Sequence, residues 1–155
     1  MPREITGTLT GRGLRFAIVV SRFNRTVTSA LLEGAVQALQ AHEVDDSGID
    51  IVHVPGAFEI TLAAERCAAT RRYAGIICLG AVVRGETPHF EFIAREVSRG
   101  INEIACRHSI PVAFGVLTTD TMEQAFARAG EGHGNKGYEA AVTALEMASL
   151  LAQLS

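Results

Sequence analysis

The sequence lacks the features that mark several classes of protein. It has no apolar run near the roughly 18 residues that a membrane-crossing helix needs. No apolar segment follows Met1–Glu4, as a signal peptide would require, so we expect a cytoplasmic protein without a membrane partner. Its 17 acidic residues outnumber its 14 basic ones, and a net charge of −3 gives no general attraction to nucleic acid.

Signs of disulfides, metal ligands and nucleotide-binding loops are also missing. Cys67, Cys78 and Cys106 are odd in number and lie in apolar or helical surroundings, so we interpret them as reduced core thiols. No CxxC or HExxH spacing occurs, and we therefore predict no metal site. The glycine-rich segment 130–137 does not form a Walker A loop, because no strand-to-helix turn surrounds its lysine.

What is present is an alternation of short apolar runs and helical patterns. Its 155 residues are 48% apolar and 20% charged, as in a compact fold. The predicted strands are Leu14–Ser21, Ile49–Val54, Gly75–Leu79 and Pro111–Leu117. The predicted helices cover residues 27–39, 59–70, 88–105, 120–129 and 138–151, and Asp120 with Glu123 resembles a capping box. This alternation predicts one α/β domain over residues 1–155, a three-layer sandwich whose four-stranded parallel sheet has helices on both faces.

The first 13 residues stand apart as an N-terminal segment. Residues 4–10 alternate weakly between polar and apolar types, which fits an edge strand or an arm. Such a segment has little of its own to pack on, so we expect it to pair with a neighbouring subunit.

The stretch Gly80–Ile93 joins a buried strand to an amphipathic helix. Thr87 can serve as the N-cap of that helix, with Pro88 at its first position. A helix start with free N–H groups beside Gly85 is a candidate anion site. His89 in the same turn is either an ordinary helix-start histidine or a proton carrier.

Parallel sheets bind ligands beyond the carboxyl ends of their strands. This rule gathers residues that each follow a strand: Phe23, Asn24, Ala57, Phe58, Glu59, Gly85, Thr87 and His89. Phe23 and Phe58 can pack or can stack on a planar ligand, and Glu59 fits a helix start. From the pattern alone, Arg128 and Lys136 are solvated cations.

Several separate motifs resemble the lumazine synthase family, which makes 6,7-dimethyl-8-ribityllumazine in riboflavin synthesis. The matching segments are SRFN at 21–24, PGAFE at 55–59, GAVVRGETPHFEF at 80–92, PVAFGVLTTDT at 111–121, RAG at 128–130 and GNKG at 134–137. The resemblance covers nearly the whole chain from Leu14 onward and implies a transferase with a flavodoxin-like fold. The substrates of such an enzyme would be 5-amino-6-(D-ribitylamino)uracil and 3,4-dihydroxy-2-butanone 4-phosphate. The resemblance implies that the reaction needs no metal or redox cofactor.

The resemblance also implies a role for each candidate residue. His89 would transfer protons. Substrate-binding residues would be Phe23, Asn24, Ala57, Phe58, Glu59, Val82, Val83, Phe114 and Lys136, and phosphate-binding residues would be Gly85, Glu86, Thr87 and Arg128. Glu86 would contribute its backbone N–H while its side chain points away. Members of this family are homopentamers or icosahedral shells of sixty subunits, with each site between two subunits.

Two other functions fit the same residues. The site of a binding module would hold a lumazine or a flavin without turnover, although such a module needs neither His89 nor Arg128. A shell-forming protein would have assembly as its main role, which is compatible with catalysis.

Overall fold

Strands and helices alternate along the chain. The computed structural model describes the chain from Met1 to Ser155, apart from the side chain of His133. The strands are β1 (Phe16–Ser21), β2 (Ile49–Val54), β3 (Gly75–Val83) and β4 (Val112–Thr119). The α-helices are α1 (Arg25–Ala41), α2 (Ile60–Ala69), α3 (His89–His108), α4 (Met122–Ala127) and α5 (Lys136–Gln153). Short 3-10 helices are η1 (Asp46–Gly48), η2 (Ala57–Glu59) and η3 (Gly132–Gly134).

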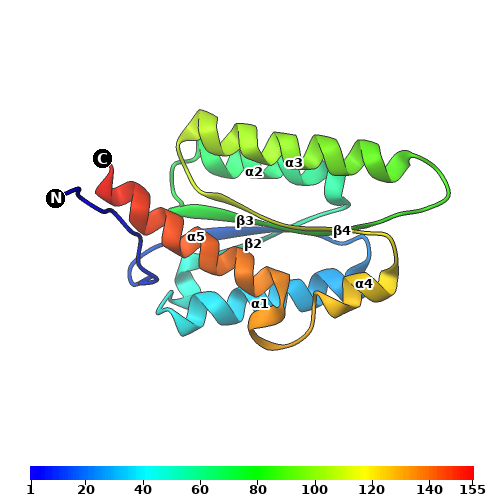
Figure 1. Cartoon of the computed structure of the whole chain (residues 1–155), viewed down its shortest axis with the longest axis horizontal. Coiled ribbons are helices and arrows are strands. Elements are labelled where there is room, and N and C mark those ends of the chain that lie inside the picture. The colour runs from blue at the N-terminus through cyan, green and yellow to red at the C-terminus, as the bar shows by residue number, and fades with distance from the viewer.

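All four strands belong to one parallel sheet in the order β2-β1-β3-β4. Helices α2 and α3 cover one face, and α1, α4 and α5 cover the other (Figure 1). The predicted three-layer α/β sandwich is therefore confirmed. The strands end on the side where the loops to α3 and α4 lie, at the right of Figure 1.

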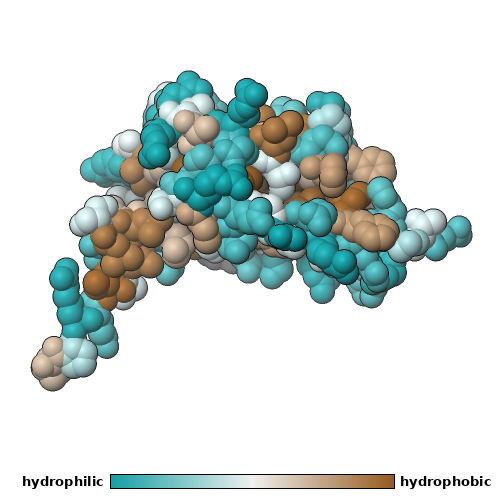
Figure 2. All heavy atoms as spheres, turned by 90° about the horizontal axis from the view of Figure 1, so that it is seen from above, coloured by the Kyte–Doolittle hydropathy of each residue, from teal (hydrophilic) through white to brown (hydrophobic). Residues whose placement is uncertain are grey.

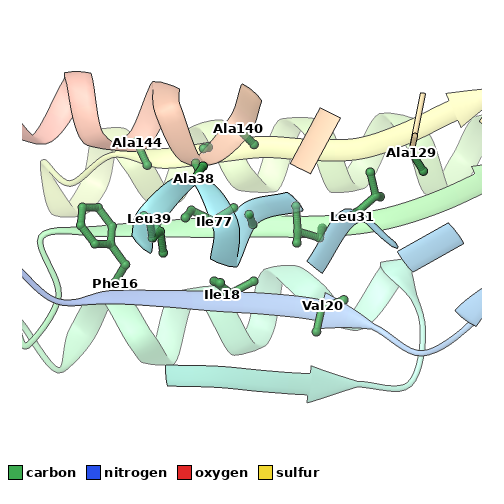
Figure 3. Packing of buried hydrophobic residues seen from close by; sticks show 14 of the residues in the cluster. Phe16, Ile18, Val20, Leu31, Ala38, Leu39, Ile77, Ala129, Ala140 and Ala144 are labelled. Atoms are coloured by element: carbon green, nitrogen blue, oxygen red, sulfur yellow. The ribbon is translucent and has the colours of Figure 1, made fainter. Parts of the chain in front are cut away.

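Strand periodicity divides the core into two clusters, one on each face of the sheet. Phe16, Ile18 and Val20 of β1 point toward α1 and α5, as Figure 3 shows. Ala17 and Val19 alternate with them and pack toward α2 and α3. All six residues of β1 are buried, as expected for a central strand covered on both faces.

Helices α1 and α5 pack closely because glycine lies at their crossing. A Cβ added to Gly137 would lie 2.0 Å from the carbonyl oxygen of Leu31, and one added to Gly34 would lie 2.3 Å from Oδ1 of Asn135. At Gly137 a side chain would collide with the backbone of α1, and at Gly34 it would displace the side chain of Asn135. This contact fixes the start of α5 against the body of α1.

Several predicted boundaries are wrong by a few residues. Strand β3 continues to Val83 instead of ending at Leu79, because it pairs with β4 along Ile76–Val83. The capping box before α4 is formed by Thr121 and Gln124, because the Thr121 hydroxyl accepts from Gln124 N while the Gln124 side chain accepts from Thr121 N. Helix α5 begins at Lys136, two residues before the predicted start.

The first residues form an arm, and no strand occurs among them in the described structure. Thr8 N donates to Ser149 Oγ at 3.0 Å and Gln153 Nε2 donates to Thr6 O at 2.8 Å, so the arm lies along α5 of its own chain. The outermost residues project from the body at the left of Figure 2. Pairing with a neighbouring subunit stays a prediction.

The three cysteines are free thiols in different environments. Cys78 is buried and Cys67 is partly buried, and burial raises the pKa of both thiols. Cys106 is exposed, so its predicted core location is wrong: it falls on the solvent side of α3. Within the described residues, none of the helices is long and apolar enough to span a membrane.

Candidate functional site

The carboxyl ends of β1, β2 and β3 open into a hollow of about 830 Å³, called the first hollow below. Its lining comes from all three strand exits and from the first turns of α3. The residues are Phe23, Asn24, Gly56, Ala57, Phe58, Glu59, Ala81, Val82, Val83, Gly85, Thr87, His89, Phe90, Phe92, Ile93 and Glu96. Ten of the predicted site residues therefore lie together, although they are spread along the chain from Phe23 to His89.

The turn after β1 presents an aromatic ring on a fixed backbone. Phe23 N donates to Pro55 O at 3.0 Å, and Asn24 adopts the left-handed conformation with φ 63°. The Asn24 amide group donates to Ala81 O at 2.9 Å and so ties this turn to β3. Phe23 itself is 70% exposed, so its ring is available for stacking instead of packing in the core.

The turn after β2 combines a buried anchor with two exposed side chains. Ala57 is buried at the start of η2, whereas Phe58 and Glu59 are exposed and line the hollow. Glu59 N donates to Gly56 O at 3.2 Å, which closes the turn. The carboxylate of Glu59 has no hydrogen-bond partner among the described residues and is free to accept one from a ligand.

The segment after β3 brings a histidine to a helix start. Val82 and Val83 are still part of the strand, and α3 begins at His89 with Pro88 in the N-cap position. The predicted cap is thus wrong by one residue, since Thr87 does not cap the helix and no side chain does. The first N–H groups of α3 consequently have no side-chain acceptor, and they border the part of the hollow that Thr87 and His89 line.

A second hollow, of about 490 Å³, lies along β4 and the start of α5. It is lined by Phe114, Gly115, Val116, Leu117, Thr118, Thr119, Arg128, Lys136, Glu139, Ala140 and Thr143. Phe114 is exposed because it lies on an edge strand of the sheet. Arg128 Nη1 donates to Gln124 O at 3.0 Å, and Lys136 Nζ lies 3.1 Å from Glu139 Oε2.

The predicted site residues are therefore divided between two places. The first hollow contains His89 and nearly all of the others, while Phe114, Arg128 and Lys136 line the second. The two hollows have no lining residue in common, and Glu86, which is exposed, lines neither. No three His, Cys, Asp or Glu side chains are grouped as metal ligands within the described structure.

Asn135 supports the second hollow, although it was not among the predicted site residues. It is only 3% exposed. Its amide nitrogen donates to Ala30 O at 3.0 Å and Ala129 O at 3.3 Å, and its oxygen accepts from the N–H groups of Gly137 and Tyr138. It therefore caps α5 and holds Lys136 next to Arg128. An asparagine before a helical pattern is a cap signal that was available in the sequence.

Four residues of α3 were also missed. Phe90, Phe92, Ile93 and Glu96 line the outer part of the first hollow. Ile93 and Glu96 follow His89 at helical spacings of four and seven residues, so the signal was the face of the helix on which His89 lies.

One family comparison covers both hollows. A model of the family described as 6,7-dimethyl-8-ribityllumazine synthase matches residues 13–152. Every lining residue of both hollows falls inside this range, whereas the first twelve residues of the N-terminal segment fall outside it. Since the match extends over most of the chain, the chain belongs to the lumazine synthase family, which acts in riboflavin biosynthesis.

Proposed function

We propose that the protein condenses 5-amino-6-(D-ribitylamino)uracil with 3,4-dihydroxy-2-butanone 4-phosphate to form 6,7-dimethyl-8-ribityllumazine, releasing phosphate, and water both at imine formation and at ring closure. The family match supports this reaction, and so does the chemistry of the first hollow. The reaction joins an amine to a ketone and eliminates phosphate. It therefore requires a surface for a planar ring, an anion site and a group that carries protons.

In this proposal the first hollow binds both substrates. Phe23 stacks on the pyrimidine, and Val82 and Val83 meet the edge of the uracil. The ribityl chain lies along the strand exits and contacts Asn24, Ala57, Phe58 and Glu59.

The phosphate is placed by the loop before α3. The backbone N–H groups of Gly85, Glu86 and Thr87 donate to it, and the dipole of α3 favours the negative charge. His89 then carries the proton from the attacking amine during imine formation and serves again as phosphate leaves. Its place in the lining of the hollow puts it next to that loop.

The charges of the side chains that line the first hollow support a site shared between subunits. Among the described residues that line the first hollow, the carboxylates are Glu59 and Glu96, and there is no arginine or lysine. A phosphate bound there needs a positive side chain from elsewhere, and Arg128 and Lys136 lie in a hollow that shares no residue with the first. We therefore propose that two subunits build each site, with Phe114, Arg128 and Lys136 supplied by a neighbour in a pentamer.

In a pentameric ring, the N-terminal arm would also connect neighbouring subunits. It would leave the helix α5 of its own chain and pair with an edge of the neighbour's sheet, where unpaired strand groups are available. Pentamers of this kind also assemble into sixty-subunit shells in the family that the chain resembles, and the arm would serve in either assembly.

The decisive experiment is a turnover assay with both substrates and without added metal, following formation of the lumazine by its absorbance. We expect turnover that persists in a chelator. Binding of lumazine without turnover would instead identify a binding module. Loss of turnover in the chelator, with recovery on adding a divalent ion, would contradict the proposed metal-free chemistry.

The shared site is tested by mixing two variants that are each impaired in one hollow, assayed at a butanone phosphate concentration below its KM. His89→Ala chains keep the second hollow intact, and Arg128→Ala chains keep the first. In rings reassembled from equal amounts, about a quarter of the interfaces combine two intact hollows, so we expect about a quarter of the wild-type activity. Mixed rings with no recovery, or a monomer by sedimentation, would contradict the shared site.

A further inference from the structure

Arg84 lies between the two hollows and lines neither of them. It follows the last residue of β3 and precedes the loop Gly85–Pro88, which borders the first hollow. Its backbone N–H donates to Thr119 O at 2.8 Å, so the pairing of β3 with β4 continues through it. The position of its backbone is thus fixed by the sheet.

The guanidinium group of Arg84 contacts three other side chains. Its Nε donates to Asp120 Oδ1 at 2.8 Å, and its Nη1 lies 3.5 Å from Glu91 Oε1. Its Cζ lies 4.6 Å from the centre of the Phe90 ring, within the range of a cation–π contact. Asp120 lies directly before α4, and Phe90 and Glu91 belong to the first turn of α3.

These contacts hold the loop at both of its ends. Arg84 is the first residue beyond β3, and Phe90 and Glu91 come directly after the loop and His89. Within the described residues, the side chains of Glu86 and Thr87 make no hydrogen bonds, and the whole loop from Gly85 to Pro88 is exposed. The side chain of Arg84 therefore links the two ends of the loop to each other and to the β4–α4 turn.

An ordinary surface ion pair is the simpler explanation for this arginine. Exposed pairs contribute little on their own, and the side chains of Arg84, Glu91 and Asp120 are 47%, 56% and 65% exposed. Arg84 differs because one rigid planar group makes a hydrogen bond, an ion pair and a ring contact at once. Lysine has the same charge but cannot reproduce that combination.

We propose that Arg84 is a positioning residue, whose guanidinium holds the loop Gly85–Pro88 and the first turn of α3 so that the loop N–H groups and His89 face the same phosphate ester. This role rests on the proposed function of the first hollow. Arg84 itself does not touch the substrate in this arrangement, and its effect is transmitted through the loop.

The kinetic test separates the two substrates. Arg84→Gln removes the charge and the planar fork, and we expect the KM for the butanone phosphate to rise by about 5- to 20-fold, since misplaced reacting groups lose rate and binding steeply. The KM for the ribityl-uracil should stay within about twofold, because the Arg84 side chain contacts none of the residues proposed to bind that substrate. Arg84→Lys should recover only part of the loss, and Asp120→Asn should raise the same KM in the same direction.

A second readout does not depend on turnover. The N–H groups of Glu91 and Phe92 donate to Pro88 O at 3.0 and 3.4 Å, so their hydrogen exchange reports how firmly the helix start is held. We expect exchange to be about 3- to 10-fold faster in Arg84→Gln, the size expected from loss of a small ion-pair network. Arg99→Gln, which breaks the Arg99–Glu103 pair on the same helix, is the matched control and should leave this exchange unchanged.

The two readouts distinguish failure of this inference from failure of the proposed function. A wild-type protein without turnover contradicts the function, and the exchange of Glu91 and Phe92 then decides the role of Arg84 alone. Unchanged exchange in Arg84→Gln, equal acceleration in Arg99→Gln, or full recovery of KM in Arg84→Lys would each overturn the positioning role. If Arg84→Gln does not fold, the same measurements on Asp120→Asn decide.

Discussion

The two hollows of the chain differ in what they offer a reacting molecule. The first is bordered by aromatic and aliphatic side chains and by the start of a 20-residue helix, and it contains His89. The second lies along an edge strand and contains Arg128 and Lys136. One suits a planar ring and a proton transfer, and the other supplies positive charge.

This difference indicates how the chemistry is divided. A condensation that expels phosphate needs a proton carrier and a cation near the same substrate. Placing the cations in a separate hollow makes an isolated chain incomplete for the proposed reaction. Changes in each hollow should therefore affect different steps.

The largest effect should come from the first hollow. We expect His89→Ala to lower kcat by about 10- to 1000-fold, because a positioned acid–base group contributes about this much or more. The lower figure applies because amines condense with ketones spontaneously once they are held together. The KM values should change little. Steady-state kinetics with both substrates measures this, and an unchanged kcat would remove His89 from the mechanism.

The framework of the second hollow should be the most sensitive to Asn135. Asn135→Ala removes a partner of two N–H groups at the start of α5 and of two carbonyl groups, Ala30 O in α1 and Ala129 O after α4. We expect a loss of about 3 kcal/mol in the free energy of unfolding. Urea denaturation measures this. Lys136→Ala, at the next residue, is the control and should cost less than about 1 kcal/mol because its ion pair is exposed. Similar losses in both variants would contradict the capping role.

Arg128 should distinguish the two substrates. We expect Arg128→Ala to weaken binding of the butanone phosphate, and of inorganic phosphate, by about 1.5–3 kcal/mol, the scale of a charge-assisted hydrogen bond. Binding of the ribityl-uracil should be almost unaffected, since we propose that this molecule stacks on Phe23 in the first hollow. Titration calorimetry with each ligand tests this, and equal losses for both would point to a structural defect.

The first hollow was predictable from the sequence because each of its main residues follows a strand. Once alternation predicts a parallel sheet, its carboxyl edge collects Phe23, Glu59 and His89 without further information. The exact start of α3 was not predictable, because residue preferences, which favour Thr87 as the N-cap, define a helix end only to within one or two residues.

The second hollow could not be predicted in this way. Phe114 lies within an edge strand, and Arg128 is the C-cap residue of α4, so neither follows a strand exit. From the residue pattern, Arg128 and Lys136 were solvated cations, and only the family resemblance assigned them a role. Their proximity depends on the buried amide of Asn135 and on the close packing of α5 against α1, which are tertiary contacts that no local pattern contains.

The smallest effect should come from a cluster in neither hollow. Oε2 of Glu65 in α2 lies 2.6 Å from Nε2 of His108 at the end of α3. Arg107 also contacts the carboxylate of Glu65. These contacts lower the pKa of Glu65, mainly through the hydrogen bond with His108. A lowered pKa means that the carboxylate stabilises the fold above its ordinary pKa, and that this contribution is lost as the pH falls through the lowered value.

Glu65→Gln should therefore lower the free energy of unfolding by less than about 1 kcal/mol at pH 7, because the cluster is partly exposed. The difference from the wild type should shrink as the pH falls below the usual range of a glutamate. Glu103→Gln, in the exposed pair with Arg99, is the matched control and should show a smaller difference at every pH. Because Glu65 borders neither hollow, kcat and both KM values should stay at their wild-type values. A changed KM for either substrate in Glu65→Gln would mean that the contact between α2 and α3 affects substrate binding in the first hollow. The expectation that this cluster contributes to stability and not to catalysis would then be wrong.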